Sequence, residues 1–215
     1  MNECETFYNE PFSNLIELAC SRSHVPGGGS ISAMSAILGA SMTAMVANLT
    51  LNKKGYEDTY IEVQMILDRV TGSIEELKKL TQRDMDSFDS LISAYRLPKE
   101  TEGQKELRRR EIQKSAIEAA MAPLTISHNA YELLFLNKRL SEIGNGSVVN
   151  DCAVATIVLE GAVRAAMLSV DVNFDTILDP EVKATIKARR DKILGEATVI
   201  RDETLLIVDQ RDKAL

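Results

Sequence analysis

Asp84 is an acidic residue at a position where a helix would normally carry an apolar side chain. The segment from about Glu57 to Tyr95 contains no proline and a single glycine, which is typical of one long helix or two helices stacked end to end. At about 100° per residue, a set of apolar residues falls within roughly 45° of Asp84 on this helix. They are Ile66, Val70, Leu77, Leu80, Phe88, Leu91 and Tyr95.

A carboxyl group on an apolar stripe loses hydration, which costs several kcal/mol unless something compensates it. One interpretation is structural, because Asp84 could form a buried ion pair or cap another helix. The other is functional, because a carboxyl group in an apolar setting has a raised pKa, can transfer protons, and stabilises a cation when ionised. We favour catalysis for Asp84, whereas Asp86 and Asp89 fall off the stripe and are expected to be solvated.

Asp151 is a second acid on a packed helical face. We expect a helix from about Asn150 to Val170, with Asn150 or Ser147 as its N-cap. Glu160 and Arg164 lie opposite Asp151. The residues on its own face are Ala155, Val158, Ala162, Ala165 and Ser169. An acid in the first helical turn is also stabilised by the helix dipole, so a structural and a binding role stay open for Asp151.

The stretch "VPGGGS", from Val25 to Ser30, joins two segments of helical character. Three consecutive glycines allow close approach of the backbone, and they precede a helix for which Ser30 is the expected N-cap. Free N–H groups at such a helix start can hold a flat or anionic ligand group. A plain tight corner between packed helices is the alternative.

The segment that follows, from Ile31 to Asn52, has no charged residue and is long enough to span a bilayer. Its residues are mainly Ala, Ser, Thr, Gly and Met, which favour close helix–helix contact. Because no other segment resembles a membrane span, we expect a buried central helix running to about Leu51 rather than a membrane protein.

The remaining segments are also helical. We expect a first helix from Pro11 to about Arg22, and a charged helix that opens after "LPKETEG" and is kinked or restarted at Pro123. "GNGS" at 144–147 is a turn, "DVNFDTILDPE" at 171–181 is a loop, and a last helix runs from Val182 onward. No stretch alternates as a strand would. The fold class is therefore an all-α bundle of long helices in a single domain, 1–215.

Composition excludes several classes of protein. The net charge of −7 and the pI near 5.0 argue against nucleic-acid binding. Cys4, Cys20 and Cys152 form no C-x-x-C pair, which suits a reduced, cytoplasmic protein. With only His24 and His128 and no metal-binding spacing, we expect no metal site. No basic segment opens the chain, so we expect no signal peptide.

Four sequence motifs, in order, carry a resemblance. "PGGGS", "D-x-D-x-F" at Asp84, "A-Y-R-L-P-K" and "G-N-x-x-x-x-N-D-x-x-V-A" resemble the cyclodeaminase/cyclohydrolase family of folate one-carbon metabolism. The resemblance extends to "VDVNFDTILD", which is similar to the family's late "N-V-x-I-N" segment. Two departures are Ser23-His24-Val25, where the family often has a second proline, and Asn150-Asp151 in place of Ser-Asp.

The resemblance implies an all-helical homodimer in which Asp84 matches the family's catalytic aspartate. It also implies a stand-alone enzyme, because no formiminotransferase domain precedes the first motif. The expected folate-binding residues are Pro26, Gly27, Gly28, Gly29, Ser30, Phe88, Asn145 and Asp151. Lys99 and Arg108 are candidates for the glutamate carboxylates of folate by charge complementarity, although each alone could be an ordinary surface charge.

The resemblance leaves two reactions open. We expect the cyclodeaminase reaction, in which 5-formiminotetrahydrofolate closes to the 5,10-methenyl form and releases ammonia. The alternative is the cyclohydrolase reaction, in which water opens the methenyl form to 10-formyltetrahydrofolate. Neither requires a metal or a redox cofactor. A non-catalytic helical protein that binds folate or serves assembly is the alternative of another class.

Overall fold

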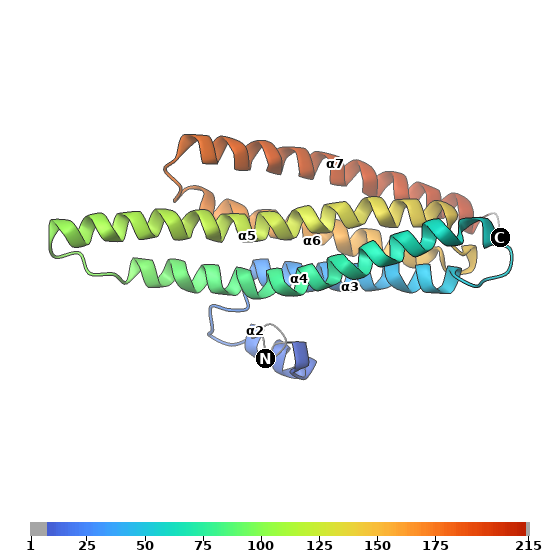
Figure 1. Ribbon diagram of the computed structural model, residues 1–215, viewed down its shortest axis with the longest axis horizontal. Coiled ribbons are helices and arrows are strands. Elements are labelled where there is room, and N and C mark those ends of the chain that lie inside the picture. Colours follow the sequence, from blue (N-terminus) through green and yellow to red (C-terminus); the bar gives the residue numbers. More distant parts are fainter. Residues whose placement is uncertain (1–7, 214–215) are drawn as a thin grey trace.

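The computed structural model describes residues 8–213, and its regular elements in that range are all helical (Figure 1). The α-helices are α2 (Phe12–Ala19), α3 (Gly28–Thr50), α4 (Tyr60–Tyr95), α5 (Glu102–Ile143), α6 (Asn150–Phe174) and α7 (Pro180–Asp212). Two 3₁₀ turns, η1 (Glu57–Thr59) and η2 (Gly146–Val148), precede α4 and α6. The all-α prediction is confirmed.

Helices α3 to α6 form a four-helix bundle. Each packs against the next, and α6 closes the ring against α3. Helix α7 covers α5 and α6 from outside, and the short α2 lies apart from the bundle, on the opposite side from α7 (Figure 1). Helix α7 therefore packs against one side of the bundle, while the outer surfaces of α3 and α6 stay uncovered.

The apolar stripe of α4 faces the bundle core as predicted. Its buried members are Ile66, Val70, Leu77, Leu80 and Leu91, whereas Tyr95 at the helix end is 43% exposed. Asp86 and Asp89 are exposed, as their position off the stripe predicts. Burial of the stripe by α3 and α5 is what fixes the inward direction of Asp84.

Helix α3 lies unusually close to α6 because its facing residues are small. Ala33, Ala36 and Ala40 are completely buried, and a Cβ atom at Gly39 would lie only 2.9 Å from Cγ of Leu159. Both α3 and α6 are long and apolar enough to cross a membrane, so α6 is a second such segment, which the sequence analysis had not recognised. Half of each apolar window is buried inside the structure.

Several helix ends differ from their expected positions. Helix α2 ends at Ala19, short of Arg22, and α5 continues through Pro123 as one helix. Thr101 begins α5 with a capping box, in which its side chain accepts from the Gln104 N–H. Helix α7 begins at Pro180, where Asp179 is the N-cap and accepts from the backbone N–H groups of the first turn.

Two differences affect the predicted site. Helix α3 begins at Gly28 with Gly27 as its N-cap, so Ser30 is not a cap but a residue of the first turn. Helix α6 begins after Val149 without a side-chain cap, and it continues to Phe174 instead of ending at Val170. The segment assigned to a loop therefore supplies one further helical turn, and this turn carries Asn173.

Candidate functional site

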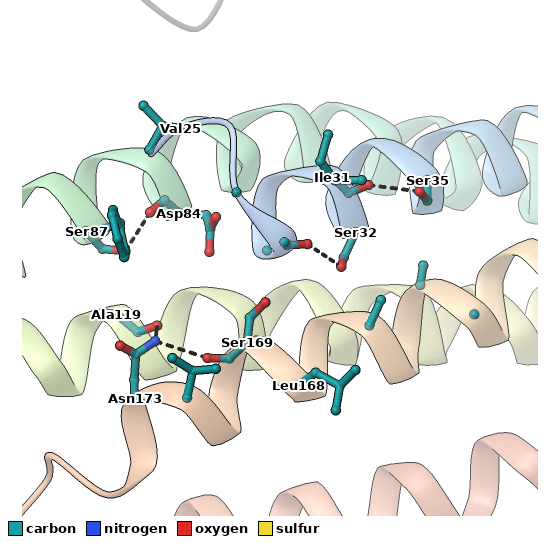
Figure 2. Close-up of a pocket in the computed structure, with 18 of the residues that line it drawn as sticks. Val25, Ile31, Ser32, Ser35, Asp84, Ser87, Ala119, Leu168, Ser169 and Asn173 are labelled. Carbon is teal, nitrogen blue, oxygen red and sulfur yellow. Dashed lines mark hydrogen bonds between the residues drawn. The ribbon is translucent and has the colours of Figure 1, made fainter. Parts of the chain in front are cut away.

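A cavity of about 700 Å³ lies between the start of α3, the middle of α4 and α5, and the second half of α6 (Figure 2). Its wall is largely apolar. The polar or glycine positions that matter for the argument are His24, Gly27–Gly29, Asp84, Ser169 and Asn173. A concave, mainly apolar pocket of this size with few polar groups is typical of a site for a small organic ligand.

Asp84 projects from α4 into this cavity. Its Oδ2 atom accepts a hydrogen bond of 2.7 Å from the Ser30 hydroxyl. Within residues 8–213 no Lys, Arg or His lies within ion-pair distance of it, so the structural ion pair considered above is absent from the described chain. Burial raises the pKa of Asp84, and the hydrogen bonds from the Ser30 side chain and backbone oppose that shift in pKa.

The second structural interpretation, helix capping, holds in part. The Ser30 backbone N–H donates a hydrogen bond to the Asp84 carboxylate, which lowers the pKa of Asp84. Ser30 lies in the first turn of α3, where free N–H groups favour a carboxylate. Capping alone does not require an open cavity, yet the same carboxyl group lines one. Asp84 thus occupies a position where it is held by α3 and is still accessible to a ligand.

Gly29 allows the close approach of α3 to Asp84. A Cβ atom at Gly29 would lie 2.1 Å from Oδ1 of Asp84, well inside any possible contact. The loop does not need left-handed backbone, since the positive-φ glycine of the described chain is Gly55, outside this segment. The glycines of this stretch therefore serve close approach of the backbone, as the sequence predicts, rather than a left-handed conformation.

The other residues of the glycine stretch and Phe88 surround the same cavity. Gly27, Gly28 and Phe88 line it, and a Cβ atom at Gly28 would lie 3.1 Å from Oγ of Ser169. Pro26 is buried behind the wall after a cis peptide bond, and Ser30 reaches the site through its bond to Asp84. The structure thus brings together residues from two segments that are distant in sequence.

Lys99 and Arg108 lie outside this cavity. They line a separate depression near the junction of α4 and α5, together with Lys105 and Arg109. Arg108 donates a hydrogen bond of 3.2 Å to the Tyr95 carbonyl oxygen. Any contact of these residues with folate would therefore be with a part of the ligand that extends beyond the cavity.

Asn145 and Asp151, which were expected to bind folate with the glycine loop, do not line this cavity within a single chain. The Asn145 amide donates to the Leu49 carbonyl oxygen at 3.0 Å, which places it at the end of α3 opposite the glycine loop. At 1.5 Å per residue the two ends of α3 are about 30 Å apart. Asp151 begins α6 at this same far end. The "G-N" motif instead forms the tight α5–α6 turn, where Asn145 accepts from the Ser147 N–H.

His24, Ser169 and Asn173 are among the cavity residues that sequence reasoning missed. His24 had been considered as a metal ligand and as part of a departure from the family motif, but its exposed ring lies 6.2 Å from that of Phe88 and lines the cavity. Ser169 had been placed on the face of Asp151 without a role. Asn173 had been assigned to a loop, although the resemblance of its segment to a family motif was a usable signal.

The sequence pattern of the Formiminotransferase-cyclodeaminase family matches residues 11–192. The chain belongs to this family. It is 29% identical over 194 residues to the methenyltetrahydrofolate cyclohydrolase of Methylorubrum extorquens, covering 90% of this chain and 93% of that protein. It is 26% identical to the formimidoyltransferase-cyclodeaminase of Sus scrofa, covering 96% of this chain but only 38% of the pig protein.

The fold has a counterpart among solved structures. The formiminotetrahydrofolate cyclodeaminase of Thermotoga maritima superimposes with a TM-score of 0.80, covering 97% of this chain and 98% of the other. Their sequences are 23% identical, so this likeness demonstrates a shared fold. The family's relatives therefore include proteins named for each of the two folate reactions.

Proposed function

We propose that this chain is a folate one-carbon enzyme. In this proposal Asp84 transfers protons to and from the atoms bonded to the carbon of the 5,10-methenyl bridge, while that bridge is formed or opened. The observation that carries the proposal is the Asp84 carboxyl group, unpaired by any described cation and exposed to a cavity at the glycine loop. Family membership and the two kinds of named relative support the substrate class.

In the cyclodeaminase reaction the folate N10 attacks the carbon of the protonated formimino group on N5. Asp84, as the carboxylate, accepts the proton that N10 loses and returns it to the amino nitrogen, which leaves as ammonia when its bond to carbon breaks. The product is the 5,10-methenyl cation. A raised pKa suits both steps, because one group must accept and then donate a proton near neutral pH.

The cyclohydrolase reaction is the second candidate, favoured by the nearly full-length match to the Methylorubrum cyclohydrolase. Here a water molecule attacks the methenyl carbon and loses a proton to the Asp84 carboxylate. Asp84 then donates that proton to N5 as the N5–carbon bond breaks, and the hydroxyl group on the carbon loses its own proton to solvent, which leaves the neutral formyl group on N10. In the ground state of this reaction the ionised carboxylate faces a cationic substrate, which stabilises substrate binding.

Purified protein supplied with each substrate distinguishes the two reactions. The cyclodeaminase produces the absorbance of methenyltetrahydrofolate from the formimino compound, and the cyclohydrolase removes that absorbance. Asp84→Asn should lower the turnover number of the active reaction by on the order of 10²-fold or more, the usual contribution of a general acid–base. Asp89→Asn, an exposed acid on the same helix, is the matched control and should keep wild-type turnover.

Retention of wild-type turnover by a folded Asp84→Asn protein would contradict the mechanism. Absence of both reactions, combined with tight folate binding, would instead support the non-catalytic folate-binding alternative. We also propose that no metal or redox cofactor takes part, because either reaction needs only proton transfer and a water molecule or an internal nucleophile. Addition of a chelator to the assay should therefore leave turnover unchanged.

We further propose a homodimer formed through the outer surface of α3 and α6. This surface exposes large apolar side chains: Ile31, Leu38 and Leu49 on α3, and Val154, Ile157, Leu168 and Val172 on α6. Several of them also line the cavity, so the cavity opens onto the same apolar surface. A second copy seated there would remove the surface from water and shelter the site, and contiguous exposed apolar patches commonly mark such interfaces.

A further inference from the structure

Pro123 interrupts the hydrogen bonding of α5 where this helix borders the cavity. Proline has no backbone N–H, so the Ala119 carbonyl oxygen, four residues earlier, has no helical donor. The Asn173 side chain of α6 takes that place, and its Nδ2 atom donates to the Ala119 oxygen at 3.1 Å (Figure 2). Both Ala119 and Asn173 lie in the cavity wall.

The same amide nitrogen makes a second bond. Nδ2 of Asn173 donates to the Ser169 carbonyl oxygen at 3.0 Å, so both of its hydrogens have acceptors. The reverse orientation of the amide would place Oδ1 against two carbonyl oxygens, which fixes the assignment of nitrogen and oxygen. In the described part of the chain Oδ1 accepts no hydrogen bond, and the residue faces the cavity.

The position of Asn173 relative to Asp84 follows from the helix geometry. Ser169 lies against Gly28, and the adjacent Gly29 lies against Asp84, so Ser169 is next to the proposed reacting group. Asn173 is four residues further along α6, which at 1.5 Å per residue is about 6 Å. A fused two-ring system with its reacting nitrogen at Asp84 would extend over a comparable length.

We infer that Oδ1 of Asn173 is the acceptor for the N–H edge of the pyrimidinone ring of the folate. This inference rests on the proposed folate function. The edge carries an exocyclic amino group and a ring N–H, and donors of this kind lose affinity when they enter an apolar cavity without an acceptor. The carbonyl oxygens of Ala119 and Ser169 accept from the amide nitrogen, so that the oxygen, rather than the nitrogen, is presented to the ligand.

Calorimetric titration with three ligands tests the assignment. The parent is 5-formyltetrahydrofolate, and the two analogues are its 2-desamino-2-methyl and 3-methyl derivatives, each of which lacks one ring-edge donor. The wild type should bind the parent about tenfold more tightly than at least one analogue, as expected for a donor–acceptor pair in an apolar site. Asn173→Ala should weaken binding of the parent by about the same factor and remove the preference.

Asn129→Ala is the matched control, because the Asn129 amide also donates to the carbonyl oxygen four residues earlier but lies outside the cavity. It should keep both affinity and preference. Asn173→Ser serves as a second variant, since serine can still donate to the Ser169 carbonyl oxygen but presents no amide oxygen. Thermal unfolding establishes that each variant is folded.

Equal affinity of the wild type for all three ligands would overturn the assignment while leaving the folate proposal intact, and this comparison needs no variant. Persistence of the preference in folded Asn173→Ala or Asn173→Ser would overturn it as well. If the wild type binds none of the three ligands, the proposed function fails and the assignment fails with it.

Discussion

At the scale of single residues, the Asp84 carboxyl group occupies the space that a side chain at position 29 would need. A methyl group at Gly29 would overlap the carboxyl group, so Gly29→Ala must displace Asp84 or push α3 outward. We expect turnover to fall by on the order of 10²-fold, similar to the loss of the carboxyl group itself. Steady-state assays of the purified variant measure this.

Gly72→Ala is the matched control for Gly29→Ala. It also lies inside a helix, and a Cβ atom there meets no heavy atom within 4 Å. It should leave turnover unchanged and stabilise the protein by up to about 1 kcal/mol through helix propensity. If Gly29→Ala retains wild-type turnover, Asp84 does not need its observed position.

The raised pKa of Asp84 also predicts how stability depends on pH. Between the ordinary pKa of 3.8 and the raised value, the folded protein holds a proton that the unfolded chain has lost. The free energy of unfolding therefore falls as the pH rises through this window. Asp84→Asn removes the effect, so it should be more stable than the wild type near neutral pH, and this difference should shrink towards pH 3.8.

Melting temperatures measured across that window for both proteins check this prediction. A difference that grows as the pH falls would show that the Ser30 hydrogen bonds, rather than burial, dominate the pKa of Asp84.

Residue-level prediction succeeded where one helical face decides the environment. The apolar stripe of α4 was sufficient to single out Asp84, and the glycine run correctly indicated close backbone approach. It failed for Asn145, because a motif shows that residues belong to the family pattern without showing which end of α3 they lie against, and these ends are about 30 Å apart at 1.5 Å per residue. Their partners at Leu49 and Thr50 are non-local contacts.

At the scale of helices, α6 shows that helical periodicity alone does not predict which side chains are buried. Glu160 was placed opposite the packed face, yet its side chain is only 8% exposed. Helix α7 covers that side, and Glu160 pairs with Arg164 at 2.5 Å and with Arg201 at 3.3 Å. A helix packed on two sides has no single apolar face, so periodicity alone cannot locate its second neighbour.

The end of α6 was misjudged for a related reason. The segment at 171–181, which begins with the polar residues Asp171 and Asn173, was assigned to a loop. Both side chains have partners on other helices: Asp171 with Arg190 of α7 at 2.7 Å, and Asn173 with Ala119 of α5. Tertiary contacts, rather than helix propensity, support this last turn.

The close contact of α3 and α6 depends on Gly39. A Cβ atom there would lie 2.9 Å from Cγ and 3.3 Å from the backbone nitrogen of Leu159. We expect Gly39→Ala to destabilise the protein by about 1–3 kcal/mol, the usual cost of overpacking. Denaturant titration measures it, with Gly195→Ala of α7, where a Cβ atom meets nothing within 4 Å, as the control. Unchanged stability would mean that α3 and α6 can move apart to accommodate the added methyl group without a cost in free energy.

At the scale of the whole molecule, the uncovered α3–α6 surface predicts self-association. Leu38 is 59% exposed on this surface and does not line the cavity. Leu38→Glu would place a charge in the proposed interface, which should shift the protein from dimer to monomer in light scattering. Ile61→Glu, at an 81% exposed position on α4, should leave the molar mass unchanged. A wild type that is monomeric at working concentrations would refute the dimer.

The two ends of the described chain lie at different distances from the cavity. Near the C-terminal end, Arg211 donates to the carbonyl oxygens of Ser141 and Gly144, at the far end of the bundle from the glycine loop. Tyr8 instead hydrogen-bonds with Thr81, about one helical turn from Asp84. For surface immobilisation or fluorescent labelling, attachment at the end of α7 would therefore place the bulky group far from the glycine loop, whereas a label on Tyr8 itself would lie near the part of α4 that carries Asp84.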